Sequence, residues 1–267
     1  MPDSVIASSI DPRYVDVDFT TEVPYTFGAI PGALFAATPQ IYEDAVGVIP
    51  ESQWPSEIEK IDGSGWMENV MRTIMNQGNE GSCVSFATAQ AFEINQGIQH
   101  GVDKIIPLSP MSLYKRIGRT AQSGSMLSDA LAEIKSRGIL PLDTPENNAR
   151  FVHTHPATGF SRSLPSGWET TGRQFIALEW FDIRTLAGLI SALLRFTPVV
   201  VGRDGHSICY ARPFYRNSSL AVLYANSWGN WGQGLGKFTS GFGVDTLSKI
   251  KASAQWAFAI RSVQVPS

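Results

Sequence analysis

The sequence of 267 residues predicts an α+β protein in which helices fill the first half and strands dominate the second. Apolar residues recur with a helical period after Cys83 and again after Ser125, whereas β-branched and aromatic runs follow from Pro198 onward. Cys83 opens a predicted helix, and His206 is set in strand-like surroundings. These observations predict a helical lobe followed by a β lobe, with one site in the cleft between them.

The helical pattern has clear starts and stops. The segment after Cys83 is apolar on most sides and stops near Gly97, which predicts a buried central helix. Ser109 and Pro110 form a cap and first-turn pair for a short helix. An apolar stripe at i, i+3, i+4 and i+7 follows Ser125. We expect helices over residues 83–97, 110–117, 125–138 and 186–194.

Strand signals concentrate near the C-terminal end of the sequence. Short β-branched or aromatic runs are separated by turn residues, such as Arg216-Asn217-Ser218, and the final run alternates apolar with other residues. We expect strands over residues 198–201, 207–211, 220–225 and 256–260.

Composition narrows the class of function. Hydrophobic residues make up 43% of the chain and charged residues 17%, with a net charge of −3, so neither nucleic acid nor an anionic membrane is an expected partner. No apolar run reaches the roughly 18 residues that span a bilayer. The start lacks the features of a secretory signal, and two cysteines fit a reducing compartment. We expect a cytoplasmic protein, or one associated with a larger microbial or viral assembly.

Residues suited to nucleophilic catalysis occur in a workable order. A thiol attacks a carbonyl as thiolate, which requires a base beside it and positive potential around it. His206 can supply the base, and the N-terminal end of the helix that starts at Cys83 can supply the potential. Asn226 can orient the imidazole, and the side-chain amide of Gln77 can donate to a developing oxyanion.

The segments around these residues resemble those of the papain family of cysteine peptidases. The family's nucleophile segment typically reads Gln-Gly-x-Cys-Gly-Ser-Cys-Trp-Ala-Phe, and the corresponding residues are Gln77, Gly78, Gly81, Ser82, Cys83 and Phe86. Its asparagine segment reads Asn-Ser-Trp-Gly followed by a second Trp-Gly, which residues 226–229 and 231–232 match. With Gly205-His206-Ser207 between them, the three segments occur in the order expected for the family.

The resemblance implies a papain-like two-lobe α+β fold, with a helical lobe, a β-barrel-like lobe and the active site in the cleft between them. It implies Cys83 as nucleophile, His206 as general base and acid, and Asn226 as orienter. Gln77 would donate to the oxyanion, while Trp228 would shield the His206–Asn226 pair and line the substrate site. The implied substrate is a peptide or protein, with no cofactor and no metal.

Gly124 and Ser125 resemble the family's backbone-binding glycine segment, which would make them substrate-binding residues. The alternative, that they only begin a capped helix, is equally open. The chain departs from the family pattern at two positions of this segment. Glu80 replaces the first cysteine of the pattern, and Val84 replaces the aromatic residue that follows the nucleophile. Gly205 replaces the commoner acid or amide before the histidine. None of these changes removes a catalytic atom.

Other candidate residues have simpler explanations. Cys209 lies an odd offset from His206 on a predicted strand, so it should point away from the cleft and be structural. It is the sole other cysteine, so the family's usual disulfides cannot form. His153 and His155 suggest a metal site, but no cysteine or carboxylate cluster completes it, so we expect a surface loop there.

Residues 1–47 form a predicted extended arm, and residues 48–267 a papain-like peptidase domain with a helical lobe over about 48–170 and a β lobe over about 171–267. The arm is too apolar for a typical disordered tail, so it should be ordered against another surface. In the cleft it would inhibit; on a protein partner it would dock. The lack of a helical propeptide pattern favours a partner.

The function expected from the sequence is that of a cysteine endopeptidase that works through a Cys-His-Asn triad and an acyl-enzyme. Two alternatives remain open. One is an assembly or structural protein, for example part of a larger particle, that has retained the fold. The other is an acyl or amide transferase that uses the same triad.

Overall fold

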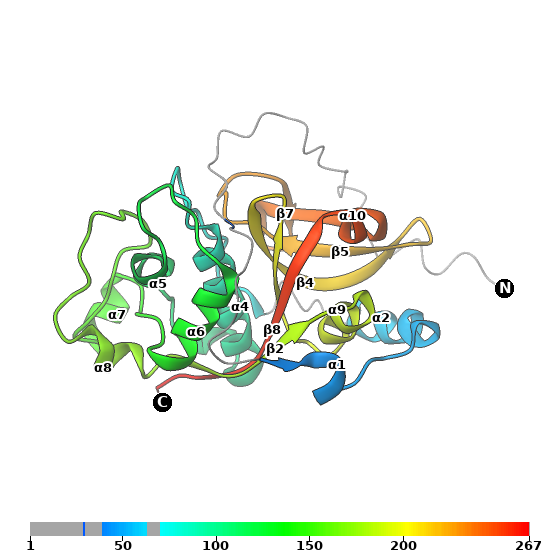
Figure 1. Cartoon of the computed structure of the whole chain (residues 1–267), viewed down its shortest axis with the longest axis horizontal. Helices are drawn as coiled ribbons and strands as arrows, with labels where there is room; N and C mark the ends of the chain where they lie inside the picture. Colours follow the sequence, from blue (N-terminus) through cyan, green and yellow to red (C-terminus); the bar gives the residue numbers. More distant parts are fainter. Residues whose placement is uncertain (1–28, 30–38, 63–69, 267) are drawn as a thin grey trace.

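The computed structural model describes Ala29 and residues 39–62 and 70–266, so most of the predicted arm lies outside the described residues. A long central helix, α4, separates two groups of elements (Figure 1). Helices α5, α6, α7 and α8 lie on one side of α4, and most of the strands lie on the other. Among the described residues, no helix is both long and apolar enough to cross a membrane.

Helices for which the sequence contains a capping residue begin and end close to the predicted positions. Ser109 accepts a hydrogen bond from the backbone N–H of Ser112, 3.1 Å away, and Pro110 follows as the first helical residue, as predicted. The helices are α1 (Tyr42–Ala45), α2 (Trp54–Asp62), α4 (Cys83–His100), α5 (Pro110–Ile117), α6 (Leu127–Ser136), α7 (Pro145–Arg150), α8 (Trp168–Gly172), α9 (Leu186–Leu194) and α10 (Leu247–Ser253).

Within the described residues, eight strands form one mixed sheet in the order β1-β2-β8-β3-β4-β5-β7-β6. Neighbouring strands are antiparallel except for β1 and β2. The strands are β1 (Gln40–Ile41), β2 (Ile176–Ile183), β3 (Val199–Arg203), β4 (His206–Arg216), β5 (Ser219–Ala225), β6 (Gln233–Leu235), β7 (Phe238–Thr246) and β8 (Ala254–Gln264). The predicted strands correspond to β3, β4, β5 and β8, whereas β1, β2, β6 and β7 were missed.

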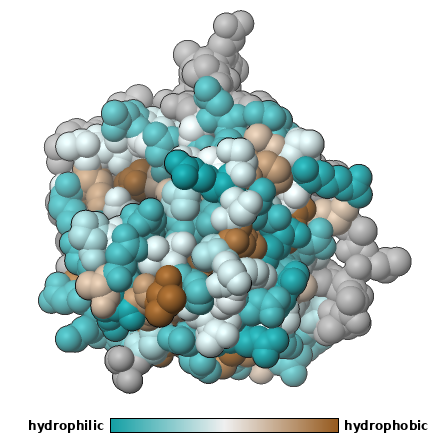
Figure 2. Space-filling view, turned by 90° about the vertical axis from the view of Figure 1, so that its left-hand side faces the viewer, coloured by the Kyte–Doolittle hydropathy of each residue, from teal (hydrophilic) through white to brown (hydrophobic). Residues whose placement is uncertain are grey.

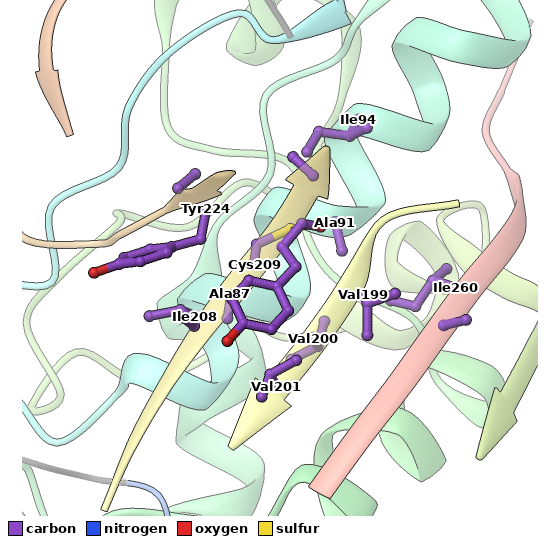
Figure 3. Close-up of a cluster of buried hydrophobic side chains, with 14 of the residues drawn as sticks. Ala87, Ala91, Ile94, Val199, Val200, Val201, Ile208, Cys209, Tyr224 and Ile260 are labelled. Carbon is purple, nitrogen blue, oxygen red and sulfur yellow. The ribbon is translucent and has the colours of Figure 1, made fainter. Parts of the chain in front are cut away.

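The core lies where α4 meets the central strands (Figure 3). Ala87 and Ala91 of α4 face Val200 of β3 and Cys209 of β4 in one cluster of buried hydrophobic side chains. Small side chains on the helix allow close approach of the helix to the sheet. Cys209 is fully buried in this cluster, and burial raises the pKa of its thiol well above the usual value.

Residues 39–47, which the sequence assigns to the arm, pack on the edge of the sheet. Strand β1 pairs with β2, and the buried ring of Tyr42 meets Phe181 edge-on at 5.7 Å between centroids. The Glu43 carboxylate accepts hydrogen bonds from the backbone N–H groups of Arg184 (3.0 Å) and Thr185 (2.7 Å) at the start of α9. These contacts join the segment to the domain.

The side of the molecule formed by the helices is mostly hydrophilic, and its hydrophobic residues are scattered in small groups (Figure 2). Val152, two residues after the end of α7, is 90% exposed. Scattered apolar residues of this kind are normal on a protein surface and mark no docking site.

Candidate active site

The predicted nucleophile, Cys83, is the first residue of α4 and is buried. The 18-residue helix directs its N-terminal backbone N–H groups and the positive end of its dipole toward this position. A thiolate is stabilised by both effects, because they lower the free energy of the charged form relative to the thiol. The local structure therefore fits the role predicted from the sequence.

The predicted base, His206, is the first residue of β4 and follows a two-residue turn after β3. Asp204 and Gly205 occupy this turn with φ of 49° and 75°. A turn with two positive φ values matches the twist of an antiparallel hairpin, and an Asp-Gly pair is among the preferred sequences for it. The turn fixes the imidazole at the tip of the β3–β4 hairpin.

The imidazole of His206 is oriented by Asn226. The Nε2 atom of His206 lies 2.9 Å from Oδ1 of Asn226, and that oxygen also accepts from the backbone N–H of Ser227 at 2.8 Å. An amide oxygen only accepts, so Nε2 carries the proton and Nδ1 is the ring nitrogen that can take one up. This tautomer is the one a thiol-activating base requires.

Burial lowers the pKa of His206 to about 4, the Asn226 hydrogen bond raises it in part, and the positive charge of Arg203 lowers it further. Burial is the largest of these effects, so the imidazole is neutral near pH 7.

Trp228 covers the imidazole. Its ring stacks on that of His206 with 4.4 Å between centroids and 25° between planes, and Trp231 meets Trp228 edge-on at 5.3 Å. Trp228 is only 1% exposed. An indole in this position excludes water from the His206–Asn226 hydrogen bond, which strengthens it.

The asparagine segment is tied directly to the segment that precedes the nucleophile. Asn76 forms an antiparallel bridge with Trp228, and the backbone N–H of Gln77 donates to the carbonyl of Ser227 at 2.8 Å. The backbone N–H of Gly229 donates to the carbonyl of Met75 at 3.2 Å. These bonds bring residues on either side of the predicted cleft into one unit.

The side chain of Gln77 is held from both sides. Its Oε1 accepts from Oγ of Ser227 at 2.6 Å, and its Nε2 donates to the carbonyl of Glu80 at 2.7 Å. The amide nitrogen carries two hydrogens, so this bond uses one and fixes the direction of the other. A donor fixed in advance is what stabilisation of an oxyanion requires. The sequence marked Gln77 but gave no sign of the role of Ser227 in holding it.

Glu80 connects this segment to a distant loop. Its carboxylate accepts from the backbone N–H of Phe160 at 2.7 Å and from that of Gly159 at 3.2 Å. Lys115 donates to the carbonyl of Phe160 at 2.5 Å. Glu80 stands where the papain family has a cysteine, and its carboxylate provides a non-covalent link from the nucleophile segment to this loop.

Gly124 and Ser125 lie beside the nucleophile segment. A Cβ atom on Gly81 would be 2.9 Å from the backbone nitrogen of Gly124, so only glycine allows the two segments to approach this closely. Ser125 forms a parallel bridge with Ala29, whose backbone N–H donates to the carbonyl of Gly205 at 2.7 Å. Ala29 thus bonds to the residue before His206 and pairs with the predicted substrate-binding segment.

The expectation of a surface loop at His153 and His155 was wrong for His155. Its side chain is 1% exposed, and its Nδ1 lies 3.1 Å from the carbonyl of Pro156 and 3.4 Å from Oγ of Ser109. Burial lowers the pKa of His155. Among the described residues, no group of three or more His, Cys, Asp or Glu side chains is arranged to hold a metal ion.

The fold is similar to that of solved papain-like cysteine proteases. Procathepsin L2 from the larval midgut of Tenebrio molitor superimposes with a TM-score of 0.64 at 17% identity, covering 91% of this chain and 79% of that one. Xylellain, a cysteine protease from Xylella fastidiosa, gives 0.60 at 16% identity, with 90% and 97% covered. ProCathepsin B S9 from Trypanosoma congolense gives 0.58 at 14% identity, with 91% and 87% covered.

The chain has the papain-like fold. The predicted two-lobe α+β architecture and the resemblance to papain-like proteins are therefore confirmed at the level of structure. No family model matches the sequence, and no curated protein matches it. Cys83 and His206 are the first residues of α4 and β4, Asn226 follows the end of β5, and Gln77 lies in the segment before α4.

Proposed function

We propose that this papain-like protein is a cysteine endopeptidase. The observation that carries the proposal is the 2.9 Å contact between Nε2 of His206 and Oδ1 of Asn226, covered by the stacked ring of Trp228. It fixes the imidazole tautomer in which Nδ1 is the basic nitrogen. This tautomer makes Nδ1 the proton-accepting nitrogen, as general-base catalysis requires.

In the proposed reaction, Nδ1 of His206 takes the thiol proton of Cys83, and the resulting thiolate attacks the carbonyl carbon of a peptide bond. The oxyanion that forms accepts hydrogen bonds from Nε2 of Gln77 and from the backbone N–H of Cys83, which lies in the first turn of α4. His206 then gives its Nδ1 proton to the leaving amine, the C–N bond breaks, and a thioester remains on Cys83.

The second half of the reaction reverses the roles. Nδ1 of His206 takes a proton from water, the hydroxide attacks the thioester carbonyl, and the acid product leaves as the thiol is restored. Gly124 and Ser125 would hold the peptide substrate through backbone hydrogen bonds, since they border the nucleophile segment beside Gly81. Trp228 would keep bulk water from the His206–Asn226 pair throughout.

The test uses peptide libraries and a thiol-reactive epoxide on the full chain. We expect cleavage of peptides by the unaltered protein and by Cys209→Ala, and none by Cys83→Ala or His206→Ala. The epoxide should label Cys83 stoichiometrically. A folded protein that neither cleaves any peptide nor reacts with the epoxide would contradict the proposal and favour the assembly role. Transfer to an added amine in preference to water would favour the transferase.

A further inference from the structure

A buried ion pair lies next to the site but outside the predicted catalytic set. Arg203 on β3 pairs with Asp245 on β7, and their side chains are 4% and 0% exposed. Oδ2 of Asp245 also accepts from the hydroxyl of Tyr210 at 2.6 Å, and Lys249 lies 3.8 Å from Oδ1. Burying two charges costs several kcal/mol per ion before their attraction offsets it, so such a pair in a core calls for a reason.

The reason lies in the position of Arg203 relative to His206. The two residues are direct partners at the end of the β3–β4 hairpin, separated in sequence by the Asp204-Gly205 turn. Directly opposed residues of an antiparallel pair project their side chains from the same face. Whatever fixes the side chain of Arg203 therefore fixes the tip of the hairpin that carries the imidazole.

A second path of contacts joins the same two residues through aromatic rings. The guanidinium of Arg203 lies 4.9 Å from the centre of the Tyr224 ring, and Tyr224 stacks on Trp231 at 6.2 Å. Trp231 contacts Trp228, which stacks on His206. Arg203 is therefore connected to His206 in two ways, directly through the hairpin and indirectly through the three aromatic rings.

We infer that Arg203 and Asp245 are a positioning pair for His206: the carboxylate anchors the arginine, and the arginine fixes the hairpin tip and the charge felt by the imidazole. The role of His206 as base rests on the function proposed above. The effect of the pair on the imidazole does not depend on that function, because it follows from the hairpin geometry and the two buried charges.

The charges of Arg203 and Asp245 should have a measurable effect on the pKa of His206. The cation of Arg203 lowers the pKa of His206 from the neighbouring strand, and Asp245 on β7 offsets that cation. The other groups near the pair are Tyr210 on β4, Tyr224 on β5 and Lys249 on α10, and Cys83 begins the helix that packs on β4. Losing the carboxylate should lower the pKa of His206, and losing the guanidinium should raise it.

The experiment is an NMR titration of the four imidazoles of the full chain, with Cys83→Ala as background so that the thiol does not contribute. We expect Asp245→Asn to move the His206 titration to lower pH by about one pH unit and Arg203→Met to move it the other way by a similar amount. The double variant Arg203→Met/Asp245→Asn should fall between the two, and it removes both buried charges, which proteins tolerate well.

Glu133→Gln is the matched control, because it breaks the partly buried Arg116–Glu133 pair (3.1 Å) in the helical lobe and should leave His206 unchanged. If Asp245→Asn does not fold, Arg203→Lys replaces it. The lysine keeps the charge but loses the planar fork, so the backbone amides of the hairpin tip should exchange hydrogen faster. An unmoved His206 titration in the folded variants, or unaltered exchange in Arg203→Lys, would overturn the inference. Failure of the peptidase function alone would appear as absent turnover in the protein that retains Cys83, with these shifts intact in the Cys83→Ala background.

Discussion

The backbone N–H of Ala29 donates to the carbonyl of Gly205 with 2.7 Å between the two atoms, one residue before His206 in the chain. Ala29 also pairs in parallel with Ser125 in the segment predicted to bind substrate. The residue is buried. If Gly124 and Ser125 bind substrate as proposed, the backbone at Ala29 competes with an extended peptide for this segment, which favours the inhibitory alternative for the arm over the partner that the sequence favoured.

Replacing Ala29 with proline should therefore raise peptidase activity severalfold. Proline has no backbone N–H and cannot donate to Gly205, so the contact is weakened without removal of the arm. Ala29→Ser keeps the N–H and serves as control. A chain that begins at Pro39 keeps β1 and the buried Tyr42, and it should show the same rise. Equal activity in all forms, with loss of binding to a partner on truncation, would restore the docking hypothesis.

The two cysteines should differ sharply in reactivity. Both thiols are buried, but Cys83 lies at the N-terminus of α4, whereas Cys209 lies among apolar side chains of the core, where burial raises its pKa. Alkylation at mildly acidic pH should label Cys83 at least about tenfold faster, because the thiolate is the reactive form. Mass spectrometry of peptides from the alkylated protein measures both rates. Similar rates for Cys83 and Cys209 in the folded state would show that the site does not activate its thiol.

Asn226→Ala should lower kcat/KM by about one to three orders of magnitude, and less than Cys83→Ala, because an orienting residue contributes less than the nucleophile. The imidazole would lose the acceptor 2.9 Å from Nε2 and could adopt the wrong tautomer. Asn147→Ala is a matched control: this buried amide donates to Pro107 and Leu142 in the helical lobe, so its loss should affect stability alone. Equal inactivity of folded Asn226→Ala and Cys83→Ala would mean that the roles are wrongly assigned.

Glu80→Ala should lower both stability and turnover. The carboxylate holds the backbone N–H groups of Gly159 and Phe160, and the Glu80 carbonyl holds Gln77. Losing charge-assisted hydrogen bonds at a half-buried position should cost on the order of 1–2 kcal/mol of unfolding free energy. Glu80→Gln keeps an acceptor oxygen and should retain most of the stability. Thermal melts and kcat for the two variants make the comparison, and identical values for both would exclude a tethering role.

The parts of this structure that were predictable are those set by local pattern. Strands β3 and β4 and the cap at Ser109 follow from residues adjacent in sequence. Helix α4 runs three residues past the predicted stop at Gly97, because that glycine serves a close approach: a Cβ there would be 2.6 Å from the carbonyl of Val70. Strand β7 was missed because its glycines and Asp245 hide the strand pattern, although pairing with β5 on one side and β6 on the other stabilises it.

The residues of the candidate site also fall into those that local sequence predicts and those that it does not. Cys83, His206 and Asn226 were predicted because each sits in a short motif of recognisable residue types. The contact of Glu80 with Phe160 and the pairing of Arg203 with Asp245 join residues far apart in sequence, and no local pattern marks either. Such contacts depend on the folded topology, since only strand order and loop placement bring the partners together.

Stability should depend on pH through Glu93, a buried carboxyl in α4. Its Oε1 accepts from the backbone N–H of Leu108 at 2.8 Å. Burial raises its pKa from 4.5 to about 7, against smaller opposing effects of that hydrogen bond and of Arg72. The folded protein therefore keeps a proton that the unfolded chain releases between about pH 4.5 and 7. The free energy of unfolding should fall as pH rises through that window, by up to about 3 kcal/mol, and Glu93 should contribute no further change above it.

Urea denaturation of the unaltered protein and of Glu93→Gln at pH 5 and pH 8 isolates this effect. His206 acts in the opposite direction, because burial lowers its pKa to about 4 and protonation of the unfolded chain favours unfolding below its ordinary value of 6.5. It acts equally in both proteins, so it cancels in their difference. Glutamine cannot ionise but keeps an oxygen for Leu108. Glu93→Gln should therefore gain stability relative to the unaltered protein on going from pH 5 to pH 8, and a constant difference between the two proteins would show that Glu93 keeps the same charge in the folded and unfolded states.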